Sequence, residues 1–470
     1  MSKTMEDKLV FNPDNYLVKT VEREGKTLTY RAFEQIPYVT NPVDQQMQRL
    51  SIFVNEEYYQ GKIINGYNLE NAPIFLPNTV GGYMPGPIEE PGKNFMGETN
   101  ASFYALLHGY VVVSPGVRGR GMKNAQGEYI GIAPAAICDL KAAVRYLKKN
   151  SNIIPGNADK IISNGTSAGG ALSALLGSTG NHPDYLPYLE DMGAAKAGDN
   201  IFAASCYCPI TNLEHADMAY EWEFYGLHDY HRMKIEETVE GRMKMTPVEG
   251  CLSERQIRMS KELKDKFPVY LNQLNLKGSS GEKLMLDEEG NGSFKEYILT
   301  YVKESAEREL DNGVDLSDLS WLTINNGTVT NVDFDGYVAY RTRMKETPAF
   351  DAVEPSTPEN ELFGTKDMQF RHFTEYSCEE DESHTEIARA SQIKMMNPMN
   401  YLEDAKAIKA DHFRIRHGSI DRDTSLAISA MLTAKLENQK VNVNLRYPWG
   451  KRHAGDYDLD ELFSWIDSLK

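Results

Sequence analysis

The chain has 470 residues, of which 41% are hydrophobic and 25% are charged, and its formal net charge at pH 7 is −18. A chain of this length and apolar content can bury a large core and exceeds what one compact domain needs, so we expect two domains. A surface this acidic would be repelled by a nucleic-acid backbone and by an anionic membrane. Neither nucleic acid nor a membrane is therefore expected as a partner.

The N-terminal segment and the cysteines carry little sign of secretion or of a bound metal. Residues 1–8 include acidic side chains and lack the apolar run of a secretory signal, and no later window resembles an uncharged membrane span, so a cytoplasmic protein is expected. The five cysteines are odd in number, and Cys206 and Cys208 are too close for a zinc knuckle or a CxxC pair; reduced, buried thiols are expected. His228 and His231 can face one way on a helix, but no partner set of carboxylates or cysteines accompanies them. We predict no metal and no cofactor.

The first elements in chain order predict an α/β protein. Residues 27–30 and 50–54 alternate in the manner of antiparallel strands at the start of a sheet. Apolar runs at 72–76 and 110–113 predict further strands. Residues 133–149 have apolar side chains at helical spacing and a basic end, which suits a helix C-terminus. The expected fold is a central, mostly parallel sheet flanked by helices.

A glycine-bracketed serine follows the next predicted strand. The sequence Gly165-Thr166-Ser167-Ala168-Gly169 comes after the apolar run 160–163 and opens a helix-like stretch of small residues, 168–176. A strand, a sharp turn and a helix in this order form the nucleophile elbow of an α/β-hydrolase. Side chains in place of the glycines would collide with the neighbouring strand and helix. Ser167 is therefore the candidate nucleophile.

A serine hydroxyl needs a histidine base and a carboxylate that holds the histidine in the right tautomer. In this fold the acid and then the histidine follow the serine, each just after one of the last strands. A predicted strand at 412–416 is followed by Asp421, and a predicted strand at 441–447 is followed by His453. Asp421 and His453 are therefore the candidate acid and base.

Each of these residues also has an ordinary interpretation. Asp421 is acceptable as a turn residue, Asp423 as the N-cap of a helix that begins near Thr424, and His453 as a loop histidine. The joint placement of the three candidates opposes those interpretations. His417 is a rival base. It lies at the end of a strand, beside the loop that carries Asp421 and Asp423 (the acid loop), and it ranks below His453.

Acyl transfer also requires backbone N–H groups directed at an oxyanion, usually from the residue after the nucleophile and from a loop after an early strand. Ala168 supplies the first. The strand at 72–76 runs into a loop with paired glycines, and Gly81 is the candidate for the second, with a simple glycine turn as the alternative. The arginines of the loop 114–121 are expected to tie that loop to core carboxylates in a structural role.

A long insertion separates the predicted strand 202–210 from the next core strand at His412. The expected domains are a first part of the α/β-hydrolase core at 1–209, an inserted lid domain at 210–398 and a second part of the core at 399–470. The insertion contains helix-like segments at 254–267 and 293–308. Because it is inserted between strands whose C-terminal ends carry the site, we expect it to cover the site and supply substrate contacts.

Over nearly its whole length the sequence resembles the bacterial tannases, tannin acyl hydrolases of the α/β-hydrolase fold with a large inserted lid. The resemblance rests on the segments 73–83, 114–121, 165–170 and 416–423 and on His453. In the family, the triad matches Ser167, Asp421 and His453. The cysteines that flank the acid and histidine of secreted fungal tannases and feruloyl esterases are absent, so a calcium site of the fungal kind is not implied.

The resemblance further implies a galloyl-binding set of one lysine and two acids, at positions that match Lys345, Glu359 and Asp423. A galloyl ring presents three adjacent hydroxyls that can donate to carboxylates, while an ammonium donates to a phenolic oxygen. Buried carboxylates left unpaired by a ring without hydroxyls would give strong discrimination. Taken without the resemblance, Lys345 and Glu359 would be interpreted as solvated surface charges.

The function that these observations predict is a serine esterase that hydrolyses galloyl esters of small-molecule substrates to release gallic acid. The alternatives of the same fold are a feruloyl esterase, a general carboxylesterase or a peptidase. An alternative of another class is a non-catalytic binding protein, against which the intact triad order argues. The preferred alcohol, activity on depside bonds and the oligomeric state, with a monomer as one option, stay open.

Overall fold

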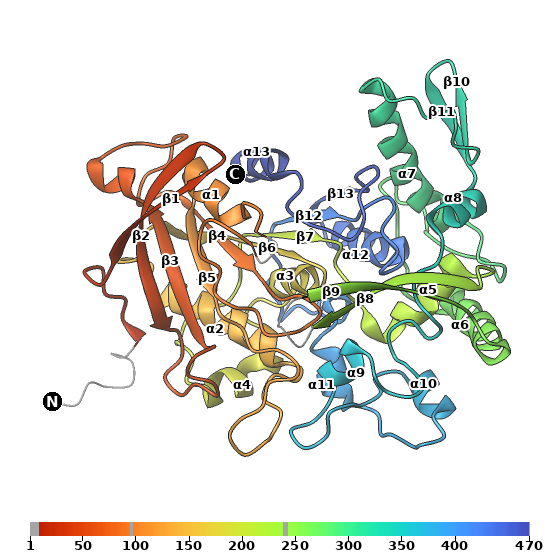
Figure 1. Ribbon diagram of the computed structural model, residues 1–470, viewed down its shortest axis with the longest axis horizontal. Coiled ribbons are helices and arrows are strands. Elements are labelled where there is room, and N and C mark those ends of the chain that lie inside the picture. The colour runs from red at the N-terminus through yellow and green to blue at the C-terminus, as the bar shows by residue number, and fades with distance from the viewer. Residues whose placement is uncertain (1–8, 95–96, 238–242, 470) are drawn as a thin grey trace.

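The computed structural model describes residues 9–94, 97–237 and 243–469. Figure 1 shows a central sheet with helices packed around it and a large group of further elements beside it. The sheet has nine strands in the spatial order β1-β2-β3-β5-β4-β6-β7-β12-β13. Their bounds are β1 (Leu17–Arg23), β2 (Lys26–Pro37), β3 (Arg49–Asn55), β4 (Pro73–Asn78), β5 (Val111–Pro115), β6 (Asn157–Thr166), β7 (Ala203–Tyr207), β12 (His412–Arg416) and β13 (Asn442–Arg446).

The sheet is antiparallel at one edge and parallel over the rest. Strands β1, β2 and β3 pair antiparallel, and β3 pairs antiparallel with β5. From β5 onward every pair is parallel. The carboxyl ends of the parallel strands therefore lie at one edge, where the loops of a site can meet. The predicted α/β-hydrolase fold, with its mostly parallel sheet, is confirmed.

Both faces of the parallel sheet are buried, because successive side chains of its strands enter different clusters. Ile74 and Ile161 pack in the larger cluster, and their neighbours Phe75 and Ile162 pack in the smaller one. Helices α2 (Ala135–Lys149), α3 (Ala168–Ser178) and α12 (Leu426–Asn438) contribute to the larger cluster. Helices α1 (Ala101–His108) and α13 (Leu459–Ser468) contribute to the smaller cluster. Continuous apolar strands are the sequence signature of such a doubly covered sheet.

The long segment between the neighbouring strands β7 and β12 leaves the sheet. Figure 1 shows its helices and two separate hairpins grouped at one side of the sheet. The hairpins are β8 (Asp229–Glu237) with β9 (Met243–Cys251), and β10 (Leu322–Asn325) with β11 (Thr328–Val332). The helices are α5 (Ala216–Phe224), α6 (Glu254–Gln273), α7 (Ser293–Asp311), α8 (Phe334–Arg341), α9 (Pro358–Leu362), α10 (Glu375–Glu380) and α11 (Ala390–Lys394). Helix α4 (Leu186–Asp191) precedes β7.

Most predicted elements are present, with differences at their ends. The strand predicted at 412–416 is β12, and the helices predicted from residues 254 and 293 begin there but continue to Gln273 and Asp311. Helix α12 begins at Leu426, because the Ser425 side chain accepts from the Ala427 N–H as the N-cap. The interpretation of Asp423 as that cap is therefore wrong.

Two other expectations are corrected. His231 lies in strand β8, so His228 and His231 do not share a helix face. Cys251 is exposed on β9, whereas Cys138, Cys206 and Cys208 are buried free thiols. Burial of every cysteine was therefore too broad an expectation.

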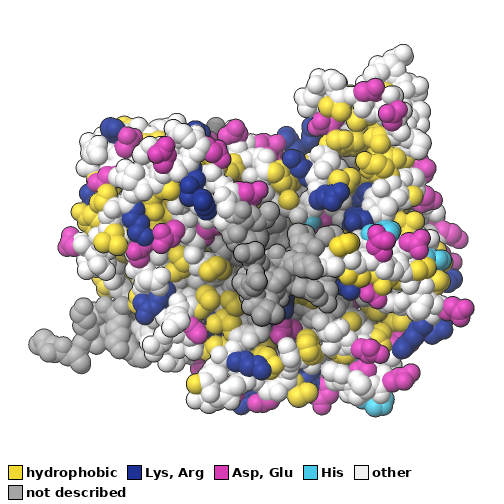
Figure 2. All heavy atoms as spheres, viewed as in Figure 1, with side chains coloured by type: hydrophobic (Ala, Val, Ile, Leu, Met, Phe, Trp, Pro, Cys, Tyr) yellow, Lys and Arg dark blue, Asp and Glu magenta, His cyan; other side chains and the backbone are white. Residues whose placement is uncertain are grey.

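On the face shown in Figure 2, acidic side chains are spread out rather than gathered at one site. Figure 2 shows Asp and Glu side chains scattered over the visible face, with Lys and Arg among them. Within the described ranges, no helix is both long and apolar enough to cross a membrane.

One buried ion pair makes a test of the core. Lys141 on α2 has no exposed side-chain surface, and its Nζ lies 2.8 Å from Oδ1 of Asp199, whose Oδ2 accepts from Arg145 Nε at 2.7 Å. Replacing Asp199 by Ala leaves these cations unpaired, and we expect the free energy of unfolding to fall by about 3–5 kcal/mol. Urea denaturation measures the change. The matched control, Asp265→Ala, removes an exposed partner of Lys261 and should cost far less; equal losses would contradict the argument.

Candidate active site

Ser167 lies in a strained turn between β6 and α3. Its backbone angles are φ 59° and ψ −120°, a region that residues other than glycine rarely adopt and that recurs at functional turns. The Ser167 N–H donates to the Tyr207 carbonyl at 2.9 Å, and its carbonyl accepts from the Ala171 N–H at 2.8 Å. The side chain is only partly buried. The turn therefore holds an accessible hydroxyl at the carboxyl edge of the sheet.

The glycines of the elbow are required by close backbone contacts. A Cβ on Gly165 would lie 2.5 Å from the carbonyl of Gly169, and a Cβ on Gly169 would lie 2.7 Å from the carbonyl oxygen of Asn78. A Cβ on Gly170 would lie 2.5 Å from the Tyr207 carbonyl oxygen. Each neighbour is backbone and cannot rotate away, so the steric reason inferred from the sequence holds.

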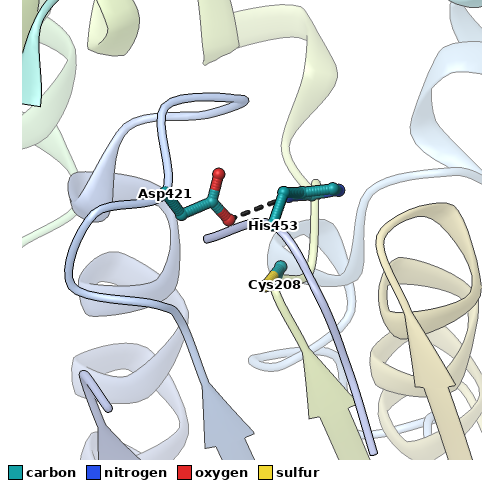
Figure 3. Close-up of side chains that lie close together, drawn as sticks. All are labelled: Cys208, Asp421 and His453. Carbon is teal, nitrogen blue, oxygen red and sulfur yellow. Dashed lines mark hydrogen bonds and ion pairs between the residues drawn. The ribbon is translucent and has the colours of Figure 1, made fainter. Parts of the chain in front are cut away.

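The loops after the last two strands bring an acid and a histidine together (Figure 3). Asp421 follows β12, His453 follows β13, and His453 Nδ1 lies 2.8 Å from Asp421 Oδ2. Asp421 is 1% exposed, whereas the His453 side chain is 22% exposed. The second Asp421 oxygen accepts from the Asp423 N–H at 2.8 Å. The histidine is thus anchored through Nδ1 and partly open to solvent.

Charge at this pair favours the imidazolium. Burial alone would lower the pKa of His453, but the carboxylates of Asp421 and Asp423 outweigh it and hold that pKa well above the usual value of a histidine. Asp423 Oδ2 lies 3.8 Å from His453 Nδ1. Burial alone would raise the pKa of Asp421, but His453 outweighs it and holds that pKa well below its usual range. The two carboxylates therefore stabilise the imidazolium that forms when His453 takes a proton.

His417, the rival base, is unsuited to that role. It has no exposed surface, its Nδ1 lies 3.0 Å from Ser429 Oγ, and burial lowers the pKa of its imidazole to about 4. Its Nε2 lies 3.5 Å from Asp421 Oδ2, the oxygen that His453 also contacts, but unlike His453 it has no exposed surface. His417 therefore supports the acid loop from inside the core.

Cys208 is a neighbour of this pair that the sequence alone did not single out. It follows β7 in a left-handed backbone conformation with φ 43°, and its Sγ donates to the Ala454 carbonyl at 3.2 Å. Ligand atoms of Cys208, Asp421 and His453 all lie within 4.8 Å of one another, which Figure 3 shows in close-up. Burial raises the pKa of the Cys208 thiol. A neutral thiol therefore packs against the imidazole.

A pocket of about 780 Å³ lies over Ser167. Gly82 of the loop after β4 lines it, together with the three residues matched to the galloyl set, Lys345, Glu359 and Asp423. A pocket of this size and mixed lining is typical of a small-molecule site. A further cavity of about 860 Å³ is lined by none of these residues.

The three predicted ring-binding residues come from separate segments of the chain. Lys345 Nζ lies 3.9 Å from the centre of the Phe350 ring, a cation–π contact that fixes the ammonium. Glu359 lies on α9 and is 9% exposed; burial raises the pKa of its carboxyl, while Lys345 opposes that rise. Asp423 comes from the acid loop. The fold thus gathers the set that the resemblance implied around one pocket.

Helix α5 holds the segment that carries Lys345. Glu221 has no exposed surface and accepts from Arg343 at 2.5 and 2.9 Å, and Thr347 Oγ1 donates to it at 2.9 Å. The Tyr220 hydroxyl accepts from the Lys345 N–H at 3.0 Å and donates to the Arg422 carbonyl at 3.1 Å. One turn of helix therefore fixes the backbone of Lys345 relative to the loop that carries Asp421 and Asp423.

A second acid of α5 supports the loop that carries Asp421. Glu223 is paired with Arg341, and its Oε2 accepts from Ser425 Oγ at 2.5 Å and from the Leu426 N–H at 2.7 Å. Arg341 also donates to the Asp421 carbonyl. In residues 216–224, acidic side chains alternate with aromatic ones, which indicates buried acids. The sequence does not identify their partners, because those lie far away in the chain.

The glycine loop after β4 is held by an arginine whose role differs from the expected one. Gly82 and Tyr83 have φ angles of 53° and 57°. Arg118 pairs with the core carboxylate of Asp139, as predicted, with the closest contact at 2.8 Å. Arg120 instead pairs with Glu361 of α9, and its Nε donates to the Gly82 carbonyl at 2.6 Å. The expectation of a core carboxylate is therefore wrong for Arg120. Gly81 is exposed and directly precedes Gly82, which lines the pocket.

The sheet order, with a strained serine between the interior strand β6 and the following helix α3, places the protein among the α/β-hydrolases. A family profile described as BD-FAE, an α/β-hydrolase family, matches residues 81–273. No curated protein sequence matches the chain.

Solved structures resemble the chain over its whole length. The tannase of Fusobacterium nucleatum is 49% identical over 98% of both chains, with a TM-score of 0.93. The tannase of Lactobacillus plantarum is 43% identical over 99% of this chain and 100% of the other, with a TM-score of 0.96. A tannin acyl hydrolase in complex with ethyl gallate is also 43% identical over 99% and 100% of the chains, with a TM-score of 0.93. The chain belongs to the tannase family, whose members are carboxylic ester hydrolases.

The charge of Asp423 gives a prediction about His453. Because this carboxylate stabilises the imidazolium, Asp423→Asn should lower the pKa of His453, and the Asp421 contact should keep the new value above that of an ordinary histidine. Imidazole chemical shifts followed by NMR across pH measure the change, with Arg452→Gln as an exposed control near His453. An unchanged His453 pKa in Asp423→Asn would contradict the electrostatic account.

Proposed function

We propose that the protein hydrolyses galloyl esters through the triad Ser167, Asp421 and His453. The observation that carries the proposal is the 2.8 Å contact between His453 Nδ1 and Asp421 Oδ2, beside a pocket that Ser167 lines. With Nδ1 bound to the acid, Nε2 is the nitrogen left to take the serine proton. A relative solved with ethyl gallate supports a small galloyl ester as the substrate.

In the proposed reaction, His453 takes the proton of Ser167 as the oxygen attacks the ester carbonyl. The tetrahedral intermediate collapses, His453 gives the proton to the departing alcohol, and an acyl-serine remains. Water then attacks the acyl-serine, with His453 again acting first as base and then as acid, and gallic acid leaves. Asp421 stays ionised and stabilises the imidazolium in both steps.

The oxyanion is assigned to the N–H groups of Ala168 and Gly81. Ala168 is the first residue of α3, where a helix supplies no internal acceptor for the N–H, and the positive end of the helix dipole lies at the same place. Gly81 precedes the pocket-lining Gly82, and the space beside its Cα is open. Donors fixed in this way stabilise charge that develops in the transition state.

Lys345, Glu359 and Asp423 are assigned to the hydroxyls of the ring. Carboxylates accept from phenolic O–H groups, and the ammonium donates to a phenolic oxygen. The burial of Glu359 and the cation–π contact of Lys345 keep both groups in place before the substrate binds. A related tannin acyl hydrolase solved with 3,4-dihydroxybenzoate supports a site that tolerates two ring hydroxyls.

We further propose that residues 210–398 form a lid on a core made of 1–209 and 399–470. The pocket over Ser167 is lined from both parts, with Gly82 and Asp423 from the core and Lys345 and Glu359 from the insertion. Substrate specificity would then depend on the inserted segment, and the chemical step on the core.

The first test of the function compares methyl gallate, methyl ferulate and methyl benzoate. We expect rapid gallate release from methyl gallate, weak or no hydrolysis of the other esters, and loss of activity of at least about 10⁴-fold in Ser167→Ala. Product release measured by chromatography gives the rates. Equal rates on the three esters would remove the ring-binding roles and leave a general esterase.

A second test isolates ring recognition. Glu359→Gln keeps the shape of the side chain but removes the charge, so kcat/KM for methyl gallate should fall by roughly 10–100-fold, the loss expected for a hydrogen bond to a charged group. Hydrolysis of p-nitrophenyl acetate, which has no acyl ring, should change little. Lys366→Met, an exposed change elsewhere in the insertion, serves as the control. A parallel loss on both esters would assign Glu359 to the general architecture of the site instead.

A further inference from the structure

One guanidinium joins the glycine loop after β4 to the helix that carries Glu359. Arg120 makes two bonds to the glycine loop: its backbone N–H donates to the Tyr83 carbonyl at 2.8 Å, and its Nε donates to the Gly82 carbonyl at 2.6 Å. Its Nη1 forms an ion pair with Oε2 of Glu361. The side chains of Arg120 and Glu361 are 20% and 9% exposed. The contact is therefore largely shielded from solvent, where a charged hydrogen bond is strong.

The loop that Arg120 holds needs an external support. Consecutive left-handed residues, Gly82 and Tyr83, reverse the chain immediately after Gly81. Tyr83 is not a glycine, so its conformation is strained unless the surroundings fix it. Its ring is buried and its hydroxyl donates to the Ile210 carbonyl at 3.3 Å. The two bonds from Arg120 fix the carbonyls of the same two residues, and thereby the direction of the neighbouring peptide groups.

The other end of the contact lies on a very short helix. Helix α9 comprises Pro358–Leu362, so Glu361 is two residues from Glu359. Five residues cannot form a stable helix without outside contacts. The remaining Glu361 oxygen accepts from Gln369 Nε2 at 2.8 Å, and Asn360 Nδ2 donates to Asp351 Oδ1 at 2.7 Å. Among the described residues that contact the Glu361 side chain, Arg120 is the one that comes from the core side of the pocket.

The charge of Arg120 also reaches the ring-binding acid. Burial raises the pKa of Glu359, while Lys345 and then Arg120 act in the opposite direction. The guanidinium therefore acts on α9 in two ways, through the direct pair with Glu361 and through the field at Glu359.

We propose that Arg120 is a positioning residue that couples the glycine loop after β4 to helix α9. Its one planar group then holds both elements in fixed positions relative to each other. The proposal rests on the roles assigned above to Gly81 and Glu359. A guanidinium is suited to this task because its fixed fork can donate in two directions at once, which a lysine ammonium on a flexible stem cannot do with the same geometry. A substrate ring seated on α9 would thus be aligned with the donors that receive its carbonyl oxygen.

The test separates the two elements by using two substrates. Hydrolysis of p-nitrophenyl acetate reports on the nucleophile and oxyanion donors without an acyl ring, and KM for methyl gallate reports on the ring site. Arg120→Ala should lower kcat for p-nitrophenyl acetate by roughly 10–100-fold, the loss expected from a small misplacement of catalytic groups, and should also raise KM for methyl gallate. Arg120→Lys should recover only part of either loss.

The partner variant and the double variant sharpen the test. Glu361→Gln should raise KM for methyl gallate with a smaller fall in kcat for p-nitrophenyl acetate than Arg120→Ala. Because both residues act through one contact, the double variant should raise KM no further than Arg120→Ala alone. Arg49→Ala is the matched control, since Arg49 also donates to two backbone carbonyls, of Gln45 and Gln35, but does not line the pocket.

The outcomes distinguish this proposal from the function on which it rests. If Arg120→Ala changes only one of the two readouts, or no more than Arg49→Ala does, Arg120 does not couple the two elements. If the unmodified protein hydrolyses p-nitrophenyl acetate but not methyl gallate, the galloyl function fails. Thermal unfolding of each variant is measured alongside, and a loss of kcat with an unchanged midpoint supports positioning over global destabilisation.

Discussion

The acidic side chains of α5 must be paired because the helix is buried, and the geometry of the site depends on those pairs. Asp217 and Glu223 are each 3% exposed and Glu221 is fully covered. A buried charge without a partner is very unfavourable, so each acid requires donors at fixed positions. Glu221 takes Arg343, Glu223 takes Arg341 and the start of α12, and Asp217 accepts from the Phe350 and Asp351 N–H groups at 2.7 and 3.0 Å. Burial raises the pKa of Asp217 to about 7. Of the three acids it therefore depends least on a cationic partner.

These pairs connect a segment of the insertion with a loop that follows a strand of the central sheet. The segment 341–351 carries Lys345 and lies in the insertion, while the acid loop carries Asp421 and Asp423 and follows a core strand. Arg341 contacts both, because it pairs with Glu223 and donates to the Asp421 carbonyl. The Tyr220 hydroxyl does the same by bonding the backbones of Lys345 and Arg422. The insertion is thus joined to the loop of Asp421 by buried polar contacts, and rigid support of this kind preorganises a site.

The acids around the pocket have different electrostatic environments. Asp421 and Asp423 both face His453 and raise its pKa, whereas burial raises the pKa of Glu359 and Lys345 opposes that rise. Groups whose environments shift their pKa values in different directions commonly have different roles at one site. Asp423 both raises the pKa of His453 and lines the pocket, so this one carboxylate faces the histidine and the space over Ser167.

The sequence by itself determined the sheet, the elbow and the order of Ser167, Asp421 and His453. These features follow from local patterns, namely apolar strands, glycines forced by backbone contact and loops that must follow particular strands. The chain could not reveal that Glu221 meets Arg343, that Arg120 reaches Glu361 instead of a core acid, or that Cys208 packs on His453. Those pairs join residues far apart in the chain, and side-chain type alone does not select one partner among many acids and arginines. Only the tertiary structure decided these pairs. Burial removes water as a competing partner, so each charge must pair with the groups that packing places beside it.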